Sequence, residues 1–301
     1  MAKTSKKPIP KCQCYERGKR PCGRRALPNS VFCQVHQNCP RPPLTGAEPL
    51  YAPEKWNRDP AIQKSHNCYS FAMNYMDPSL AQKCRQDNND SDKCRARFHQ
   101  PGSVHGERNE LDAKERRNCK ALDRLIRADN PAITKTDFYG TCPAKTSKIF
   151  MTVDRGEDFH FYEQNPPDVL ANNVKQTINT IPLYSDKGGS NPAKREDAVG
   201  QPIFNPELAS RDFRWKGSNL NYEDSCGFYC VPRDGSVRLA SSAQNGGDRG
   251  ESRRRRDPLS SAQNGGVRLD SRLRRESSSS TQKGGRIQRR RSRRQLRRPQ
   301  T

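Results

Sequence analysis

Large apolar residues are concentrated in one part of this chain. Only 31% of its 301 residues are hydrophobic, 30% are charged, and the mean hydropathy is −1.13. Aromatic and aliphatic residues, including both tryptophans, Trp56 and Trp215, recur between Tyr51 and Pro232. Because a folded domain must bury apolar side chains, we predict that residues 51–232 form the globular domain.

Within this domain, helical patterns come first and strand patterns later. The helical segments are residues 69–76 and 110–127. The strand-like segments are 148–154 and 158–162, which we expect to form a hairpin, and 228–232. Helices followed by strands predict an α+β fold.

The first 40 residues are basic and cysteine-rich, with too few apolar residues for a core. Cys12, Cys22, Cys33 and His36 are spaced as Cys-x9-Cys-x10-Cys-x2-His, and such thiol and imidazole ligands suit tetrahedral zinc. Metal binding would supply the folding free energy that a core cannot. We therefore predict a structural zinc module over residues 1–40.

The module resembles small basic zinc modules of viral and cellular proteins, at positions Cys12, Gly18, Cys22, Arg24, Cys33 and His36. Two further cysteines, Cys14 and Cys39, could replace a ligand, and disulfides are the alternative to metal. A proline-rich linker, residues 41–50, follows.

The remaining cysteines have no metal-ligand spacing. The start of the chain lacks the apolar core of a signal peptide, so we expect a reducing compartment and mostly free, buried thiols. Cys226 and Cys230, four residues apart, could instead form a redox pair or metal clip. The other members of this set are Cys84, Cys94, Cys119 and Cys142.

A candidate nucleophile stands at the start of the first predicted helix. Cys68 follows polar residues and enters an apolar segment, and a helix N-terminus stabilises a thiolate. His160 is the histidine set in an alternating apolar frame, in the segment 158–162. A thiol with a histidine base is the chemistry of a cysteine hydrolase.

Such a site also needs a polar group that orients the imidazole. We assign Asn172 to this role, with Asn173 as an equal candidate because a one-residue shift reverses strand faces. His66 is an alternative base, although it is too close to Cys68 along the chain to point at it. His99 and His105 flank a probable loop and are candidates for contact with substrate.

Several segments together resemble proteins of large DNA viruses of algae, namely residues 66–74, 100–102, 142–143, 158–162, 205–211 and 226–232. Their Asn-Cys-Tyr and Asp-x-His-Phe-Tyr motifs are similar to those of papain-like hydrolases of the NlpC and CHAP type. The resemblance implies a papain-like domain with Cys68 as nucleophile and His160 as base. It departs at Asn172, where the viral proteins carry histidine.

The C-terminal segment, residues 233–301, consists mainly of Ser, Arg, Gly, Gln and Asn, which predicts a disordered tail. It carries 20 basic and 6 acidic residues, or +14 of the total net charge of +23. Arginine clusters of this kind bind polyanions without sequence preference, so we expect DNA or RNA as partner, with nuclear import and plain solvation as alternatives.

These features together predict a cysteine peptidase or amidase held on nucleic acid by its tail, acting on an unknown peptide or amide. The alternative is a non-enzymatic virion or nucleic-acid-associated protein with an inert papain-like domain. No segment approaches the length of an apolar membrane span, so we expect an intracellular location, in the host cytoplasm or nucleus, or in the virion.

Overall fold

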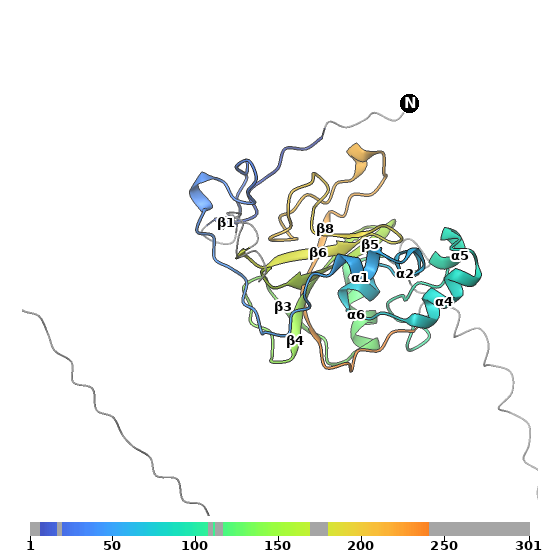
Figure 1. Cartoon of the computed structure of the whole chain (residues 1–301). Helices are drawn as coiled ribbons and strands as arrows, with labels where there is room; N and C mark the ends of the chain where they lie inside the picture. The colour runs from blue at the N-terminus through green and yellow to red at the C-terminus, as the bar shows by residue number, and fades with distance from the viewer. Residues whose placement is uncertain (1–6, 17–19, 108–110, 112–116, 169–179, 241–301) are drawn as a thin grey trace, which may run out of the picture. The chain divides into compact units, whose positions relative to one another are not determined.

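The structure is a computed structural model that describes residues 7–16, 20–107, 111, 117–168 and 180–240 (Figure 1). The described residues belong to one compact unit. The arginine clusters of the predicted tail lie outside the described residues, as do Asn172 and Asn173.

A six-stranded antiparallel sheet forms the centre of the unit, in the order β3-β8-β4-β5-β6-β7. With the helices described below, it confirms the predicted α+β class. The strands are β3 (Thr134–Thr136), β4 (Thr146–Asp154), β5 (Asp158–Asn165), β6 (Leu183–Lys187), β7 (Ala193–Lys194) and β8 (Asp224–Pro232). A separate two-stranded ribbon joins β1 (Tyr15–Glu16) and β2 (Arg20–Pro21).

Alternate residues of the central strands face two different hydrophobic clusters, as the pleat of a strand requires. Ile149 and Met151 of β4 pack with the helical residues Leu125 and Ile126 on one face. Phe150, between them in sequence, belongs to the other cluster, which also contains residues of the N-terminal segment. The sheet is therefore covered on both faces.

Short helices precede the sheet in sequence, and most begin at a residue that caps them. Asp59 and Asp77 each accept a hydrogen bond from the backbone two residues on, and proline is the first helical residue after each. The helices are α1 (Pro53–Asn57), α2 (Pro60–Ser65), α3 (Cys68–Ala72), α4 (Pro78–Gln86), α5 (Ser91–Arg95) and α6 (Cys119–Asp129), with 3-10 turns η1 (Gln34–His36) and η5 (Arg214–Lys216).

The predicted hairpin is present as β4 and β5. The predicted helices are shorter than expected. The first ends at Ala72, because Asn74 turns the chain with φ of 51° and Tyr75 N–H bonds back to Ser70. The second begins only at Cys119, where Asn118 caps it. The predicted strand at 228–232 is longer and lies between β3 and β4.

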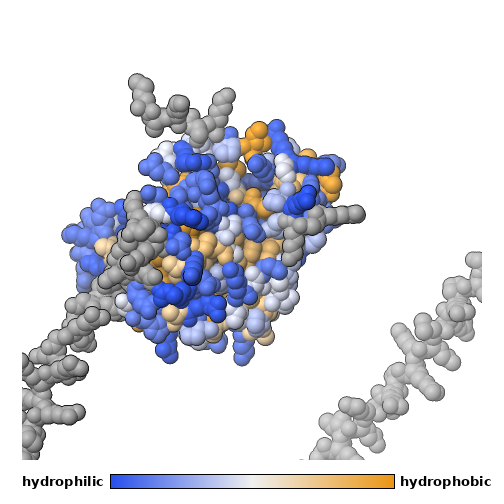
Figure 2. Space-filling view, turned by 180° about the vertical axis from the view of Figure 1, so that it is seen from behind, coloured by the Kyte–Doolittle hydropathy of each residue, from blue (hydrophilic) through white to orange (hydrophobic). Residues whose placement is uncertain are grey.

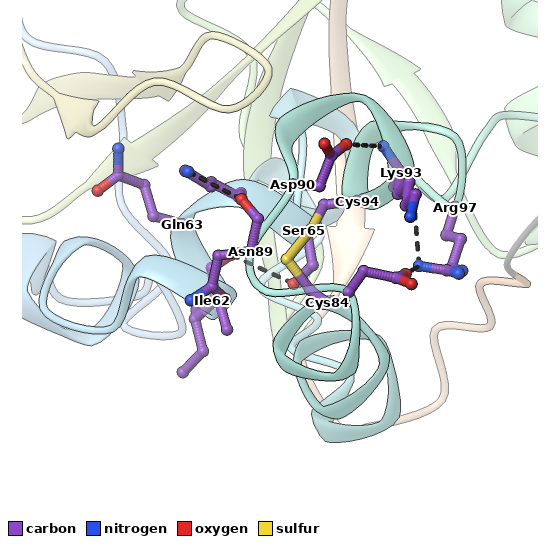
Figure 3. The surroundings of a disulfide bond; sticks show 12 residues. Ile62, Gln63, Ser65, Cys84, Asn89, Asp90, Lys93, Cys94 and Arg97 are labelled. Carbon is purple, nitrogen blue, oxygen red and sulfur yellow. Dashed lines mark hydrogen bonds and ion pairs between the residues drawn. A yellow bond between two sulfur atoms is a disulfide. The ribbon is translucent and has the colours of Figure 1, made fainter.

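Eight cysteines form disulfides, which corrects the expectation of free thiols outside the metal site. The Cys84–Cys94 bond joins α4 to α5 and is buried between them (Figure 3). Cys226 and Cys230 do not pair with each other. The remaining disulfides are Cys14–Cys39, Cys119–Cys226 and Cys142–Cys230.

The packed structure continues past the expected boundary at Pro232. The guanidinium of Arg233 donates to the carbonyl of Ala72 at 3.0 Å, and Arg238 exchanges backbone hydrogen bonds with the Asn130 amide. Val237 and Leu239 pack against the cluster that contains Cys68. Residues 233–239 therefore belong to the folded unit.

The surface seen from behind the view of Figure 1 is mostly hydrophilic, with smaller hydrophobic areas (Figure 2). None of the helices in the described ranges is long and apolar enough to cross a bilayer.

Candidate active site and metal centre

Cys68 is held at the first position of α3 by a reciprocal cap. The Asn67 side chain accepts from the backbone N–H of Ser70 at 3.1 Å, and the Ser70 hydroxyl accepts from the N–H of Asn67 at 3.1 Å. All five residues of α3 are buried, and the Cys68 side chain is 5% exposed. The cap therefore fixes the thiol at the helix start.

His160 lies on β5 and contacts Asp186 of the neighbouring strand β6. Its Nε2 donates to Oδ2 of Asp186 at 2.8 Å, and both side chains are buried. The strand register accounts for the contact: Tyr162 is opposite Asp186, so His160, two residues away on the same face, is its diagonal neighbour.

The thiol of Cys68 is close enough to the imidazole of His160 to act on its charge, and its Sγ donates to the carbonyl of Phe159, the residue before His160, at 3.9 Å. Burial alone would lower the pKa of His160, but the Cys68 thiolate and the Asp186 carboxylate favour the imidazolium more strongly and raise this pKa to about 10. The three side chains thus form a continuous thiol–imidazole–carboxylate series.

Asp186 lies beside the His160 imidazole, where sequence analysis expected Asn172, and Asn172 lies outside the described residues. The contact between His160 and Asp186 depends on the pairing of β5 with β6, which a local motif does not encode. The sequence signal was weak: it is the charged pair Asp186-Lys187 at the end of a short segment, and only the structure shows that all five residues of β6 are buried.

Lys187 holds the backbone that leads into Cys68. Its buried ammonium donates to the carbonyls of Gln63 at 2.5 Å, His66 at 2.7 Å and Gly189 at 2.6 Å. Burial lowers the pKa of Lys187 to about 7, against the opposing effect of the Cys68 charge. Lys187 therefore ties α2 and the entry to α3 to the end of β6.

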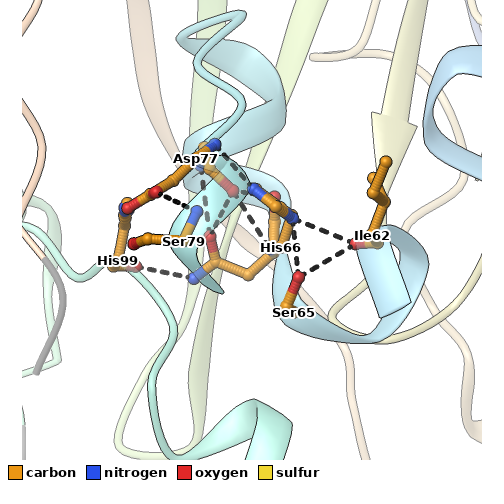
Figure 4. A network of polar contacts seen from close by, with 8 residues as sticks. Ile62, Ser65, His66, Asp77, Ser79 and His99 are labelled. Atoms are coloured by element: carbon orange, nitrogen blue, oxygen red, sulfur yellow. Dashed lines mark hydrogen bonds and ion pairs between the residues drawn. The ribbon is translucent and has the colours of Figure 1, made fainter. Parts of the chain in front are cut away.

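His66 is part of the scaffold, where its ring contacts Ile62 and Asp77 (Figure 4). Its Nδ1 donates to the carbonyl of Ile62 at 3.0 Å, and its Nε2 accepts from the N–H of Asp77 at 2.9 Å. Burial lowers the pKa of His66 to about 4. With both ring nitrogens engaged, His66 is not the base.

His99 is also internal, which corrects the expectation that it contacts substrate. It is 1% exposed, its Nε2 lies 3.5 Å from the Asp77 carboxylate, and its carbonyl accepts from the Asn67 amide at 2.8 Å (Figure 4). Burial lowers its pKa to about 4. His105 is exposed, and the cavity described next is not lined by either residue.

Cys68, His160 and Asp186 line one cavity of about 780 Å³. The ring of Tyr222 forms part of its wall, 5.3 Å from the His160 ring, and the Tyr222 hydroxyl donates to Asp158 at 2.8 Å. A cavity of this size accepts a small molecule or a few residues of a peptide. The series of three side chains is thus open to a ligand.

A second site is formed by Cys12, Cys22, Cys33 and His36, whose ligand atoms lie within 4.8 Å of one another. The Sγ atoms of Cys22 and Cys33 are 3.9 Å apart, and His36 Nδ1 is 3.5 Å from Cys33 and 3.6 Å from Cys12. Tetrahedral zinc with Zn–S of about 2.3 Å and Zn–N of about 2.0 Å would place its ligands about 3.5–3.8 Å apart. The cluster can therefore hold a metal ion.

The metal cluster is built into the folded unit through Gln13, which is fully buried. Its amide oxygen accepts from the backbone N–H groups of Phe204 and Asn205 at 2.7 and 2.9 Å, and its amide nitrogen donates to Pro202. The ring of Phe32 packs edge-on against Phe204 at 4.9 Å. Apolar packing against the sheet, unforeseen from the sequence, thus supports this segment.

No protein-family model matches the chain, and no solved structure matches it. The chain is similar to a protein described as insoluble matrix shell protein 1, from Ruditapes philippinarum. The two are 29% identical over 161 residues, which cover 54% of this chain and 80% of that protein.

Proposed function

We propose that this protein is a cysteine hydrolase, a peptidase or amidase with a papain-like arrangement of its site. The observation that carries the proposal is the buried contact of Cys68, His160 and Asp186 at the wall of a 780 Å³ cavity. The nucleophile and the base occur in the chain order and on the kinds of element that the resemblance implies, a helix start followed by a strand.

The chemistry follows from this arrangement. The Cys68 thiolate attacks the carbonyl carbon of an amide, and the electron pair of the carbonyl moves to its oxygen, which the backbone N–H of Cys68 helps to stabilise. As the C–N bond breaks, His160 donates its proton to the leaving amine. Water then attacks the thioester, His160 accepts a proton, and the acid and the thiolate are released. Asp186 keeps the imidazole oriented and favours its protonated form.

Two further parts of the proposal concern the ends of the chain. Cys12, Cys22, Cys33 and His36 bind one structural zinc ion, as the ligand spacing of the cluster supports. The arginine-rich tail binds DNA or RNA through its charge.

The disulfides bear on where the protein folds. Four of them in one unit favour an oxidising environment. This differs from the reducing compartment expected from the sequence, and we propose that the chain is oxidised during maturation.

The hydrolase proposal is tested by incubating the full chain with a defined peptide mixture and detecting new amino termini by mass spectrometry. Cleavage is expected with the native chain and with His105→Ala, which alters an exposed histidine, and is expected to disappear with Cys68→Ala and His160→Ala. Cleavage that persists in Cys68→Ala would contradict the proposal.

A non-enzymatic structural role is the second candidate, and the similarity to a shell matrix protein favours it. In that case Cys68 is an inert buried thiol. An electrophilic peptide probe separates the two candidates, because a structural thiol would not react with it in the folded chain.

A further inference from the structure

The ammonium groups of two lysines lie close to one aromatic ring at the wall of the active-site cavity. The Nζ of Lys194, at the end of β7, lies 5.3 Å from the centre of the Phe213 ring, and the Nζ of Lys216, at the end of η5, lies 5.9 Å from it. Cation–π attraction of this kind holds an ammonium group near a ring. Two segments far apart in sequence thus bring two positive charges together.

Ring contacts connect this lysine pair to the catalytic histidine. Phe213 meets Tyr222 edge-on at 6.2 Å, and Tyr222 lies 5.3 Å from His160. All five side chains line the same cavity as Cys68. The lysine pair is therefore separated from the imidazole by two aromatic rings, and a ligand in the cavity can reach both.

The charge of the pair is not neutralised by an ion pair with any carboxylate of the described residues. The carboxylates that line the cavity, Asp158 and Asp186, are engaged by Tyr222 and His160. Asp197 is near enough to act on both lysines electrostatically, but its oxygens accept three backbone N–H bonds.

Further cations reinforce the positive potential. Lys7 lies 5.4 Å from the ring of Trp215, next to Lys216, and partial burial with the charges of Lys194 and Lys7 lowers the pKa of Lys216. Arg95 and Arg117 also line the cavity. An excess of positive charge on this part of the cavity wall attracts an anionic ligand.

We propose that Lys194 and Lys216 form a subsite for a carboxylate side chain of a peptide substrate, so that the enzyme prefers acidic peptides. The inference rests on the proposed hydrolase function for its choice of a peptide, since the cleaved bond is an amide. The aromatic wall of Phe213 and Tyr222 would pack against the methylene groups that precede the carboxylate.

Binding to Cys68→Ala protein tests the subsite without turnover. The probes are fluorescent peptide pairs that differ only by glutamate or glutamine at one position. The glutamate member is expected to bind about 10-fold more tightly at low salt, with the difference shrinking as salt rises. Adding Lys194→Gln and Lys216→Gln is expected to abolish the difference.

The matched control carries Lys83→Gln and Lys120→Gln, which remove the same charge from positions that do not line the cavity. This control is expected to keep the preference for the glutamate peptide. Because the tail is intact in all variants, binding of a peptide by the tail is the same in each of them. Equal affinity for both peptides, or a preference that survives in the Lys194→Gln, Lys216→Gln variant, would overturn the proposal.

Two additional outcomes test the lysine subsite separately from the proposed hydrolase function. If the lysine-dependent preference is present but native protein cleaves neither peptide, the subsite stands and the hydrolase function falls. Binding of an acidic oligosaccharide or a single-stranded oligonucleotide is measured in the same variants. If that binding requires the two lysines while binding of acidic peptides does not, the proposed peptide subsite is wrong.

Discussion

Replacing Asp186 by asparagine keeps an oxygen beside His160 but removes its charge. The contact is 2.8 Å long and both side chains are buried, so solvent screens it little. A hydrogen bond to a charged group contributes about 1.5–3 kcal/mol. Since about 1.4 kcal/mol corresponds to one pKa unit, the pKa of His160 should fall from about 10 by one to two units.

The direction of the stability effect follows from the same values. An unfolded histidine has a pKa of about 6.5, so the raised pKa of His160 stabilises the native state fully below that pH. The contribution is lost as pH rises toward 10. Asp186→Asn should therefore lower the free energy of unfolding at pH 6 by about 1.5–3 kcal/mol and have less effect at pH 10.

The assay is a titration of the His160 imidazole by NMR on histidine-labelled protein, with denaturant unfolding at both pH values. Asp129→Asn is the matched control, because Asp129 is also a buried carboxylate, and it accepts hydrogen bonds from the backbone of Gly102 and Val104 and not from His160. The control should leave the His160 titration unchanged, whatever its effect on stability. An unaltered His160 pKa in Asp186→Asn would refute the coupling.

Three other perturbations have expected outcomes. Chelation should remove one zinc ion per chain and lower the melting temperature measured by calorimetry, and Cys22→Ser should bind no zinc. Acidification from pH 6.5 to 4 should destabilise the fold by a few kcal/mol in denaturant titrations, because the unfolded chain protonates His66 and His99 while burial keeps them neutral in the native state. Replacing Cys119 and Cys226 by serine should cost about 2–5 kcal/mol of unfolding free energy, because that bond closes a loop of 107 residues.

Each of these has a contrary result. Zinc absent from native protein, or zinc retained by Cys22→Ser, would reject the assigned ligand set. Stability that stays constant between pH 6.5 and 4 would mean that the two histidines are accessible to protons. Full stability in the serine variant would mean that the bond does not constrain the unfolded chain.

Sequence patterns predicted those features that depend on residues close to one another along the chain. The β4–β5 hairpin was predictable because two short apolar segments flank a turn at Gly156. The four metal-site residues were predictable because their spacing is short and their side chains are natural metal ligands. Cys68 was predictable as a helix start, because the capping residues Asn67 and Ser70 are its neighbours in sequence.

Long-range pairings were not predictable in the same way. Asp186 reaches His160 through the register of β5 and β6, and no local sequence motif spans both strands. The disulfides join residues up to 107 positions apart, and no spacing rule selects one pairing among the cysteines. The lysine pair on Phe213 likewise joins residues from β7 and η5 that are more than 20 positions apart.

The reactivity of the Cys68 thiol tests the central claim most directly. Iodoacetamide labelling at pH 7, mapped by mass spectrometry, should modify Cys68 in the folded chain at least about 5-fold faster than in the denatured chain, because a free cysteine is only a few per cent thiolate at that pH. His160→Ala should remove this advantage. A Cys68 thiol that stays protected until the chain unfolds, or that reacts equally fast without His160, would contradict the account.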